Sequence, residues 1–163
     1  MKLILTILLL TAVFISCKKD KVEPGVNVEI YLLKSQLAIP GKCQVNASSA
    51  ILQETPIVRN QDIMAYSKTD HQFTISDDSL KKLRALPDNT PFAILVDKQV
   101  VYYGIVKPFY SSSSCTSSIT MNNFEGPNKI SMNLGYAGAD INIDDQRNNP
   151  KLLATLRNQG KLQ

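Results

Sequence analysis

The stretch Phe92-Ala93-Ile94-Leu95-Val96, followed by Val100-Val101-Tyr102-Tyr103-Gly104-Ile105-Val106, decides the fold. The first run is continuously apolar, which predicts a strand buried on both faces. Asp97-Lys98-Gln99 supplies a turn between the two runs. Residues 91–106 therefore predict a β-hairpin, and Gly104 is the residue at which a bulge is expected.

A helix is predicted immediately before this hairpin. Ser76 or Asp77 can cap it, because a side-chain oxygen accepts a free amide hydrogen of the first turn. Pro87 ends it. Its apolar face is formed by Leu80, Leu83 and Leu86.

The remaining periodicity predicts further short strands and a second helix. Strands are expected over 26–33, 71–75 and 140–144, and a second hairpin over 117–121 and 129–134. A C-terminal helix should begin at Asn149-Pro150 and run to Arg157. We therefore expect residues 26–163 to form a single α+β domain, with a mostly antiparallel β-sheet built of hairpins and one central and one C-terminal helix.

The helix 79–86 and the hairpin that follows it resemble a unit in the periplasmic head of the SecD export subunit. That family has an apolar strand, an Asp-Gly turn and a returning strand at this place. Here Lys98 replaces the glycine, and Tyr103 stands where a proline is usual. The resemblance covers about thirty residues. It carries no catalytic motif, so it implies an α+β fold and nothing about activity.

The first residues have the pattern of a secretory signal peptide. Met1-Lys2 is a positive start, residues 3–15 are almost entirely apolar, and Ser16 is a small residue before the hydrophobicity breaks. The apolar run is shorter than the roughly 20 residues that a membrane span needs. We expect residues 1–16 to be cleaved as a signal peptide.

Phe14-Ile15-Ser16-Cys17 resembles the lipobox of Gram-negative envelope lipoproteins. This resemblance implies that Cys17 becomes the first mature residue and carries diacylglycerol and an N-acyl chain. Residues 17–25 would be a lipidated tether. The resemblance also implies a lipid-anchored protein of the cell envelope, on the periplasmic or surface face of the outer membrane. An ordinary cleaved signal with an incidental cysteine is the alternative.

The charge balance excludes one class of partner. The chain has 18 Lys and Arg against 14 Asp and Glu, a formal net charge of +4. The basic residues are scattered and form no stripe interleaved with aromatics, so nucleic-acid binding is not expected.

Two cysteines remain beyond Cys17. Cys43 and Cys115 lie in an oxidising compartment if the leader is a secretory signal, so they can form one disulfide. Alternatively, each is a separate small apolar residue.

Residues with catalytic or metal-binding chemistry are few. His71 is the single histidine, and the loop from Ser111 to Cys115 offers nucleophiles, but no Gly-x-Ser-x-Gly elbow occurs. The Asp140–Asp145 segment begins like a calcium loop, yet Asp145 occupies the glycine position and Lys151 the glutamate position. We expect no metal, no cofactor and no enzymatic activity.

Four aromatic residues lie on or just after the main hairpin, beside the serine-rich loop: Tyr102, Tyr103, Phe109 and Tyr110. Tyr with Ser is typical of adaptable recognition surfaces. Alternation puts Tyr102 and Tyr103 on opposite faces, so one of them should be core.

The sequence favours a non-enzymatic module that binds an envelope protein or ligand. The alternatives are a small Ser or Cys hydrolase that uses His71, and a structural accessory of an envelope complex.

Overall fold

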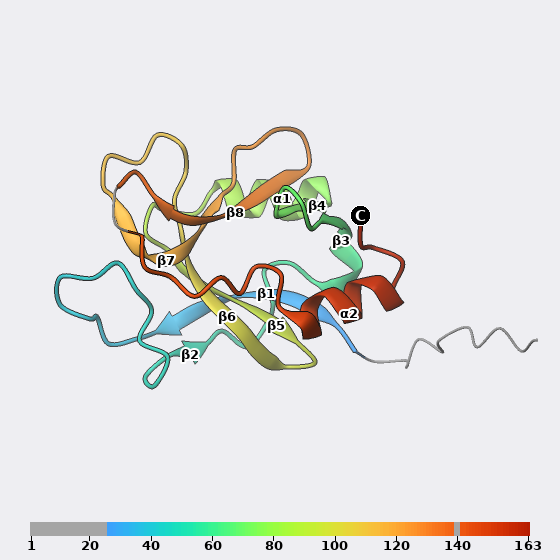
Figure 1. The fold of residues 1–163 in the computed structure, drawn as a ribbon, viewed down its shortest axis with the longest axis horizontal. Coiled ribbons are helices and arrows are strands. Elements are labelled where there is room, and N and C mark those ends of the chain that lie inside the picture. The colour runs from blue at the N-terminus through green and yellow to red at the C-terminus, as the bar shows by residue number, and fades with distance from the viewer. Residues whose placement is uncertain (1–25, 139–140) are drawn as a thin grey trace, which may run out of the picture.

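The computed structural model describes residues 26–138 and 141–163, which form a curved sheet of eight strands with two α-helices (Figure 1). The helices are α1 (Asp77–Arg84) and α2 (Pro150–Asn158), and a 3-10 turn spans Asn60–Asp62. The strands are β1 (Val28–Ser35), β2 (Ile51–Leu52), β3 (Ile63–Ser67), β4 (Gln72–Ile75), β5 (Pro91–Val96), β6 (Gln99–Val106), β7 (Cys115–Asn122) and β8 (Lys129–Tyr136). The predicted α+β class is confirmed.

The strand order across the sheet is β2-β1-β5-β6-β7-β8-β4-β3. Hairpins join β3 to β4, β5 to β6 and β7 to β8. Other neighbours are distant in sequence, since β1 pairs with β5 and β4 with β8. The pair β6–β7 is parallel, which the expectation of a sheet built of hairpins did not include.

The central hairpin is as the sequence predicts. Every residue from Phe92 to Val96 is at most 3% exposed. The two turn residues, Asp97 and Lys98, have φ angles of 51° and 59°. Positive φ at both central residues matches the type I′ turns whose twist suits a two-residue hairpin.

The bulge of this hairpin does not lie at Gly104. The register slips between Ile94 and Leu95, which places the extra residue of β6 at Val101. Gly104 is required for packing instead, because a Cβ there would lie 2.3 Å from Cζ of Phe92 and 2.8 Å from the carbonyl oxygen of Ile119.

Both helices begin as predicted. Ser76 Oγ accepts a hydrogen bond from the Ser79 amide at the start of α1, and Asn149 caps α2. The short strand expected over 140–144 is wrong for its described part, because residues 141–146 are irregular. Asp140 lies outside the described residues.

The core has two parts, one on each face of the sheet. The larger part packs the apolar sides of α1 and α2 against strands from both ends of the sheet. The smaller part, on the other face, lies under the segment that follows β1 and includes Val45, Ala93 and Ile105. No helix in the described ranges is both long and apolar enough to span a bilayer.

Other backbone covers part of each edge of the sheet, beside β1 and beside β3. The Ile30 amide on β1 donates to the Val58 carbonyl at 2.9 Å. The Tyr66 amide on β3 donates to the Lys161 carbonyl at 2.7 Å, and the Gln163 amide returns a bond to Tyr66. Covered edges do not offer a template for strand addition.

Candidate functional site

The four aromatic residues named as a possible binding surface lie in three places. Tyr102 is 5% exposed and belongs to the larger core, while Tyr103 packs against the smaller core on the other face. Phe109 and Tyr110 are 65% and 58% exposed. The prediction of opposite faces for the two hairpin tyrosines is confirmed, but the surface is not continuous.

Phe109 and Tyr110 form an exposed aromatic cluster with a third ring, Phe124, from the turn between β7 and β8. The ring centroids of Phe109 and Tyr110 are 5.4 Å apart, and both rings meet Phe124, at 5.9 Å and 5.4 Å. All three pairs are edge-to-face, an arrangement that aromatic quadrupoles favour. We call Phe109, Tyr110 and Phe124 the aromatic cluster.

Arg84, in the last turn of α1, fixes one side of the cluster. Its guanidinium carbon lies 5.4 Å from the centroid of the Phe124 ring, in a cation–π contact. The same side chain donates to the carbonyls of Asn123, at 3.2 Å, and Gly126, at 2.9 Å. The turn that carries Phe124 is thereby attached to the helix.

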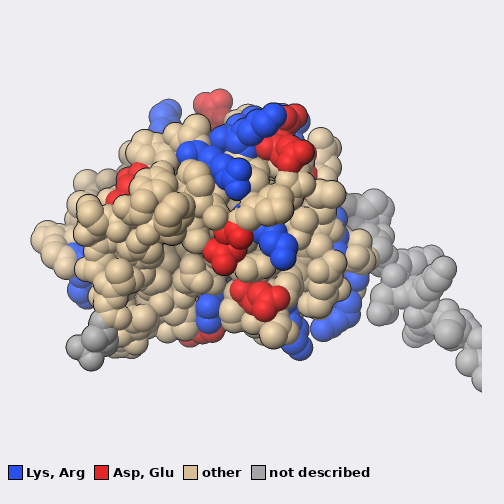
Figure 2. All heavy atoms as spheres, turned by 90° about the horizontal axis from the view of Figure 1, so that it is seen from above, with Lys and Arg blue, Asp and Glu red and all other residues tan. Residues whose placement is uncertain are grey.

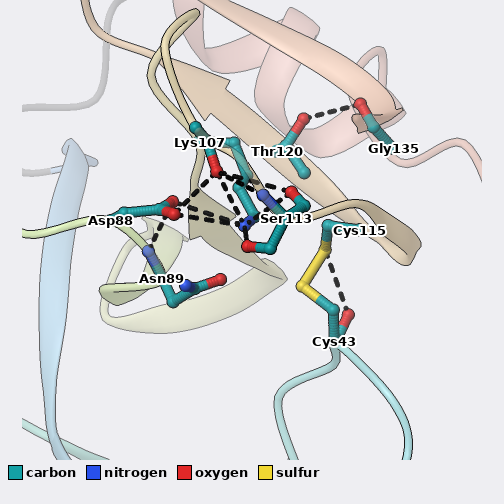
Figure 3. Close-up of a disulfide and its surroundings, with 9 residues drawn as sticks. Cys43, Asp88, Asn89, Lys107, Ser113, Cys115, Thr120 and Gly135 are labelled. Atoms are coloured by element: carbon teal, nitrogen blue, oxygen red, sulfur yellow. Dashed lines mark hydrogen bonds and ion pairs between the residues drawn. A yellow bond between two sulfur atoms is a disulfide. The ribbon is translucent and has the colours of Figure 1, made fainter. Parts of the chain in front are cut away.

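A buried lysine holds the loop that carries the other two rings (Figure 3). Lys107 is 0% exposed, and its Nζ donates to Ser113 Oγ at 2.7 Å and to Ser111 Oγ at 3.1 Å. It also forms an ion pair with Asp88, whose Oδ1 lies 3.3 Å away. Ser111 Oγ donates to the other Asp88 oxygen at 2.6 Å. Burying a charged group is costly unless it is paired and hydrogen-bonded, and the Lys107 ammonium group has both kinds of partner.

Tyr136 on β8 holds the same loop through its hydroxyl group. Its hydroxyl group donates to the carbonyls of Phe109, at 2.8 Å, and Ser111, at 3.1 Å. Its ring lies 5.9 Å from Lys107 Nζ. Two rings of the aromatic cluster, Phe109 and Tyr110, are therefore presented on a loop with a fixed backbone, and such pre-organisation reduces the entropy lost on binding.

Cys43 and Cys115 are joined in a disulfide with Cα atoms 5.2 Å apart (Figure 3). The bond connects the segment between β1 and β2 to the first residue of β7. It also removes Cys115 as a free nucleophile. Of the two alternatives that the sequence left open for these cysteines, the structure has the bonded one.

His71 does not meet the serine-rich loop in the described contacts. It lies in the turn between β3 and β4, and its carbonyl accepts a hydrogen bond from the amide of Met132 on β8. Cys115 pairs with Tyr136, which is also on β8. Four strand positions separate Met132 and Tyr136, about 13 Å. The hydrolase alternative required His71 close to Cys115 or to a loop serine, and these contacts do not bring them together.

His71 lies just before β4, although the strand expected over 71–75 would include it. It has a φ of 53°, is half-buried, and its Nδ1 has no hydrogen-bond partner among the described residues. Burial, with Arg147 nearby, lowers its pKa.

The acidic segment that begins like a calcium loop is engaged by an arginine. Arg147 Nη2 lies 2.8 Å from Asp145 Oδ2, and hydrogen bonds from Arg147 lower the pKa of this carboxyl to about 2. Within residues 26–138 and 141–163, no three metal-ligating side chains of His, Cys, Asp or Glu gather.

A pocket of about 500 Å³ lies at the start of α1. Its lining has both signs of charge, with Arg59 and Lys82 beside Asp62 and Asp78. None of its described side chains has a buried polar atom without a partner. This pocket therefore gives no chemical indication of a particular ligand.

Sequence reasoning missed Phe124, Arg84 and Lys107. Phe124 had a signal, because a large aromatic residue in a six-residue turn between two strands has little core to enter. No sequence signal marked Lys107 as buried, since an isolated lysine is usually exposed. Arg84 had no signal either, because nothing in the sequence links the end of α1 to the turn between β7 and β8.

The end of the molecule that carries the β6–β7 loop has few charges. In Figure 1 this loop lies at the upper left, opposite the side at which β1 begins. Seen from above in Figure 2, the left part of the surface is largely uncharged, while acidic and basic side chains gather over the middle and right.

Searches of protein-family models, curated proteins and solved structures gave no match to this chain.

Proposed function

We propose that this protein is a lipoprotein of the bacterial cell envelope, acylated at Cys17, whose domain binds a partner protein and catalyses no reaction. The observation that carries the binding role is the aromatic cluster. Phe109 and Tyr110 are more than half exposed, yet their loop is held by Lys107 and Tyr136. Rigid exposed aromatic residues beside an arginine are the side chains that dominate protein–protein binding energy.

The position of the cluster supports this role. The tether would join the domain where β1 begins, and the β6–β7 loop lies at the other end of the long axis (Figure 1). An anchor at that side leaves the cluster open to a partner in the envelope. An exposed apolar patch on a folded domain is a usual mark of an interaction site.

A photo-crosslinking residue tests the binding role in the full-length protein in its own envelope. It is placed at Tyr110 or, as a matched control, at Met64 on β3, because both side chains are 58% exposed. We expect a discrete protein adduct from position 110 and none from position 64. Phe124→Ser should weaken the adduct. Equal adducts at both positions, no adduct at 110, or adducts with lipid alone would contradict the proposal.

The anchor is tested separately at Cys17. Two or more acyl chains hold a protein on a membrane stably, whereas one gives only reversible binding. Cys17→Ala should therefore move the protein from the detergent phase to the aqueous phase in phase separation. If the variant has lost the apolar leader and still stays in the detergent phase, the anchor is not at this residue.

One contact favours a second candidate, a Ser–Lys hydrolase. Lys107 Nζ lies 2.7 Å from Ser113 Oγ, within the reach of a base for a nucleophile. The same Nζ is in an ion pair with Asp88, and an ammonium group has no lone pair to take a proton. Labelling by a fluorophosphonate probe that Ser113→Ala abolishes would support this candidate, and no labelling would remove it.

A further inference from the structure

Arg84 carries an exposed positive charge beside the aromatic cluster, and part of its guanidinium group is unused. Its Nε donates to the Asn123 carbonyl and its Nη2 to the Gly126 carbonyl. A guanidinium group has five N–H donors, so both hydrogens of Nη1 and one of Nη2 remain. These hydrogens have no acceptor among the described residues. We call this part of the group, from Nη1 to Nη2, the free edge of Arg84.

The carboxylates near the aromatic cluster are engaged elsewhere. Among the described residues, none forms an ion pair with Arg84. Asp88, four residues further along the chain, pairs with the buried Lys107. Glu125, next to Phe124, accepts hydrogen bonds at 2.6 Å and 3.1 Å from two polar side chains of the β7–β8 hairpin. The positive charge of Arg84 therefore has no counter-charge within the described part of the chain.

The contacts of Arg84 also fix the direction of its free edge. Two carbonyl groups hold one side of the planar guanidinium group, and the Phe124 ring lies 5.4 Å from its central carbon. The remaining edge of such a group matches a carboxylate, which accepts two parallel hydrogen bonds from it. Because the side chain is already held, little conformational entropy is lost when a carboxylate binds.

One segment of a partner can reach both the free edge and the exposed rings. The guanidinium carbon of Arg84 and the ring centroid of Tyr110 each lie 5.4 Å from the Phe124 centroid, so they are at most twice that distance apart. An extended chain rises about 3.3 Å per residue, so about three residues span this distance. Phe109 and Tyr110 are more than half exposed and offer contact area to an apolar side chain.

We propose that the aromatic cluster and Arg84 together bind an acidic segment of a partner protein. An apolar side chain of this segment packs on the rings, and an Asp or Glu within about three residues of it binds the free edge of Arg84. This inference rests on the proposed binding role of the aromatic cluster and adds the chemistry of the partner.

A selection from a library of random peptides tests the inference on the acylated full chain in nanodiscs of phosphatidylcholine. The wild type should enrich peptides that carry an apolar residue and an Asp or Glu within about three positions of each other. Arg84→Gln should keep the apolar preference and lose the acidic one. Lys82→Gln is the matched control, because it removes an exposed charge of the same helix that lines the pocket at the start of α1. It should keep both preferences.

An enriched acidic peptide then measures the ion pair. Arg84→Gln should bind it about threefold to tenfold more weakly than the wild type does. Changing the acidic residue of the peptide to its amide should cost the wild type the same factor and cost Arg84→Gln almost nothing. A displaced Phe124 alone would weaken acidic and amide peptides equally, so this comparison separates recognition of the carboxylate from support of the turn.

The outcomes separate this inference from the binding role on which it rests. Enriched peptides with an apolar residue but no acidic one would overturn the inference and leave the aromatic cluster as a binding surface. No enrichment would overturn it too, while the photo-crosslink at Tyr110 still decides the binding role. A selection that Phe124→Ser leaves unchanged would contradict both. Binding to phosphatidylglycerol vesicles that Arg84→Gln abolishes would assign the free edge to a lipid phosphate and would also overturn the inference.

Discussion

Lys107 is fully buried, and its Nζ lies 3.3 Å from Oδ1 of Asp88, whose side chain is 30% exposed. The two ends of this ion pair are therefore unequal. A half-buried carboxylate that loses its partner can be hydrated, whereas a buried ammonium group cannot.

The inequality predicts an order of stability for two variants. Asp88→Ala leaves the Lys107 charge buried with only neutral partners, so the unfolding free energy should fall by about 3 kcal/mol. Lys107→Met should cost less, about 1 kcal/mol, because its stem still fills the site. Urea unfolding measures both, and Glu54→Ala, at an exposed loop carboxylate, is the control. The reverse order would show that Asp88 does not compensate the buried charge.

The turn of the central hairpin provides a stabilising substitution. Lys98 has a φ of 59°, and a left-handed conformation costs a residue with a Cβ roughly 1 kcal/mol. Lys98→Gly should therefore raise the unfolding free energy by up to about 1 kcal/mol. In contrast, Lys82→Gly, at an exposed position of α1, should lower it by about 1 kcal/mol. Equal losses in both variants would contradict the turn geometry.

The hairpin and both helices could be predicted because their signals are local. Phe92 to Val96 is apolar without interruption, Ser76 and Asn149 stand at cap positions, and each signal needs only its own neighbours in sequence. The parallel pairing of β6 with β7 could not be predicted in this way. A strand pattern identifies a strand but not its partner, and this partner follows a loop.

The candidate surface was half predicted for a similar reason. Tyr102, Tyr103, Phe109 and Tyr110 lie close together in sequence, and alternation already predicts that one of the two hairpin tyrosines is core. Strand alternation places Tyr102 and Tyr103 on opposite faces of the sheet, and the end of β6 leaves Phe109 and Tyr110 on an exposed loop. The third ring, Phe124, comes from another turn and joins the cluster only through tertiary structure.

The disulfide closes a loop with a sequence separation of 72 residues. In the chain-entropy model a loop of this length contributes about 4 kcal/mol of stability at most. Cys43→Ala combined with Cys115→Ala should lower the unfolding free energy by up to this amount, and a reductant should then have no further effect. Mass mapping without reduction of protein isolated from the envelope checks the bond itself. Two free thiols there would contradict it.

The last prediction concerns His71 and pH. Burial and Arg147 lower its pKa below the usual value of about 6.5, while Asp145 and Asp70 act in the opposite direction. The folded protein therefore binds this proton less readily than the unfolded chain does. By linkage, the contribution of His71 to the unfolding free energy is complete above pH ~6.5 and declines as the pH falls below that value.

His71→Asn is the variant that tests this linkage. Asn tolerates the φ of 53° at this turn and does not titrate, whereas Ala would add strain. The wild type should lose more stability than His71→Asn between about pH 7.5 and pH 5.5. Because His71 has no catalytic partner in the described contacts, the variant should also complement a deletion strain. Failure to complement, with a normal protein level and melting temperature, would instead favour a catalytic His71 and return attention to the serine-rich loop.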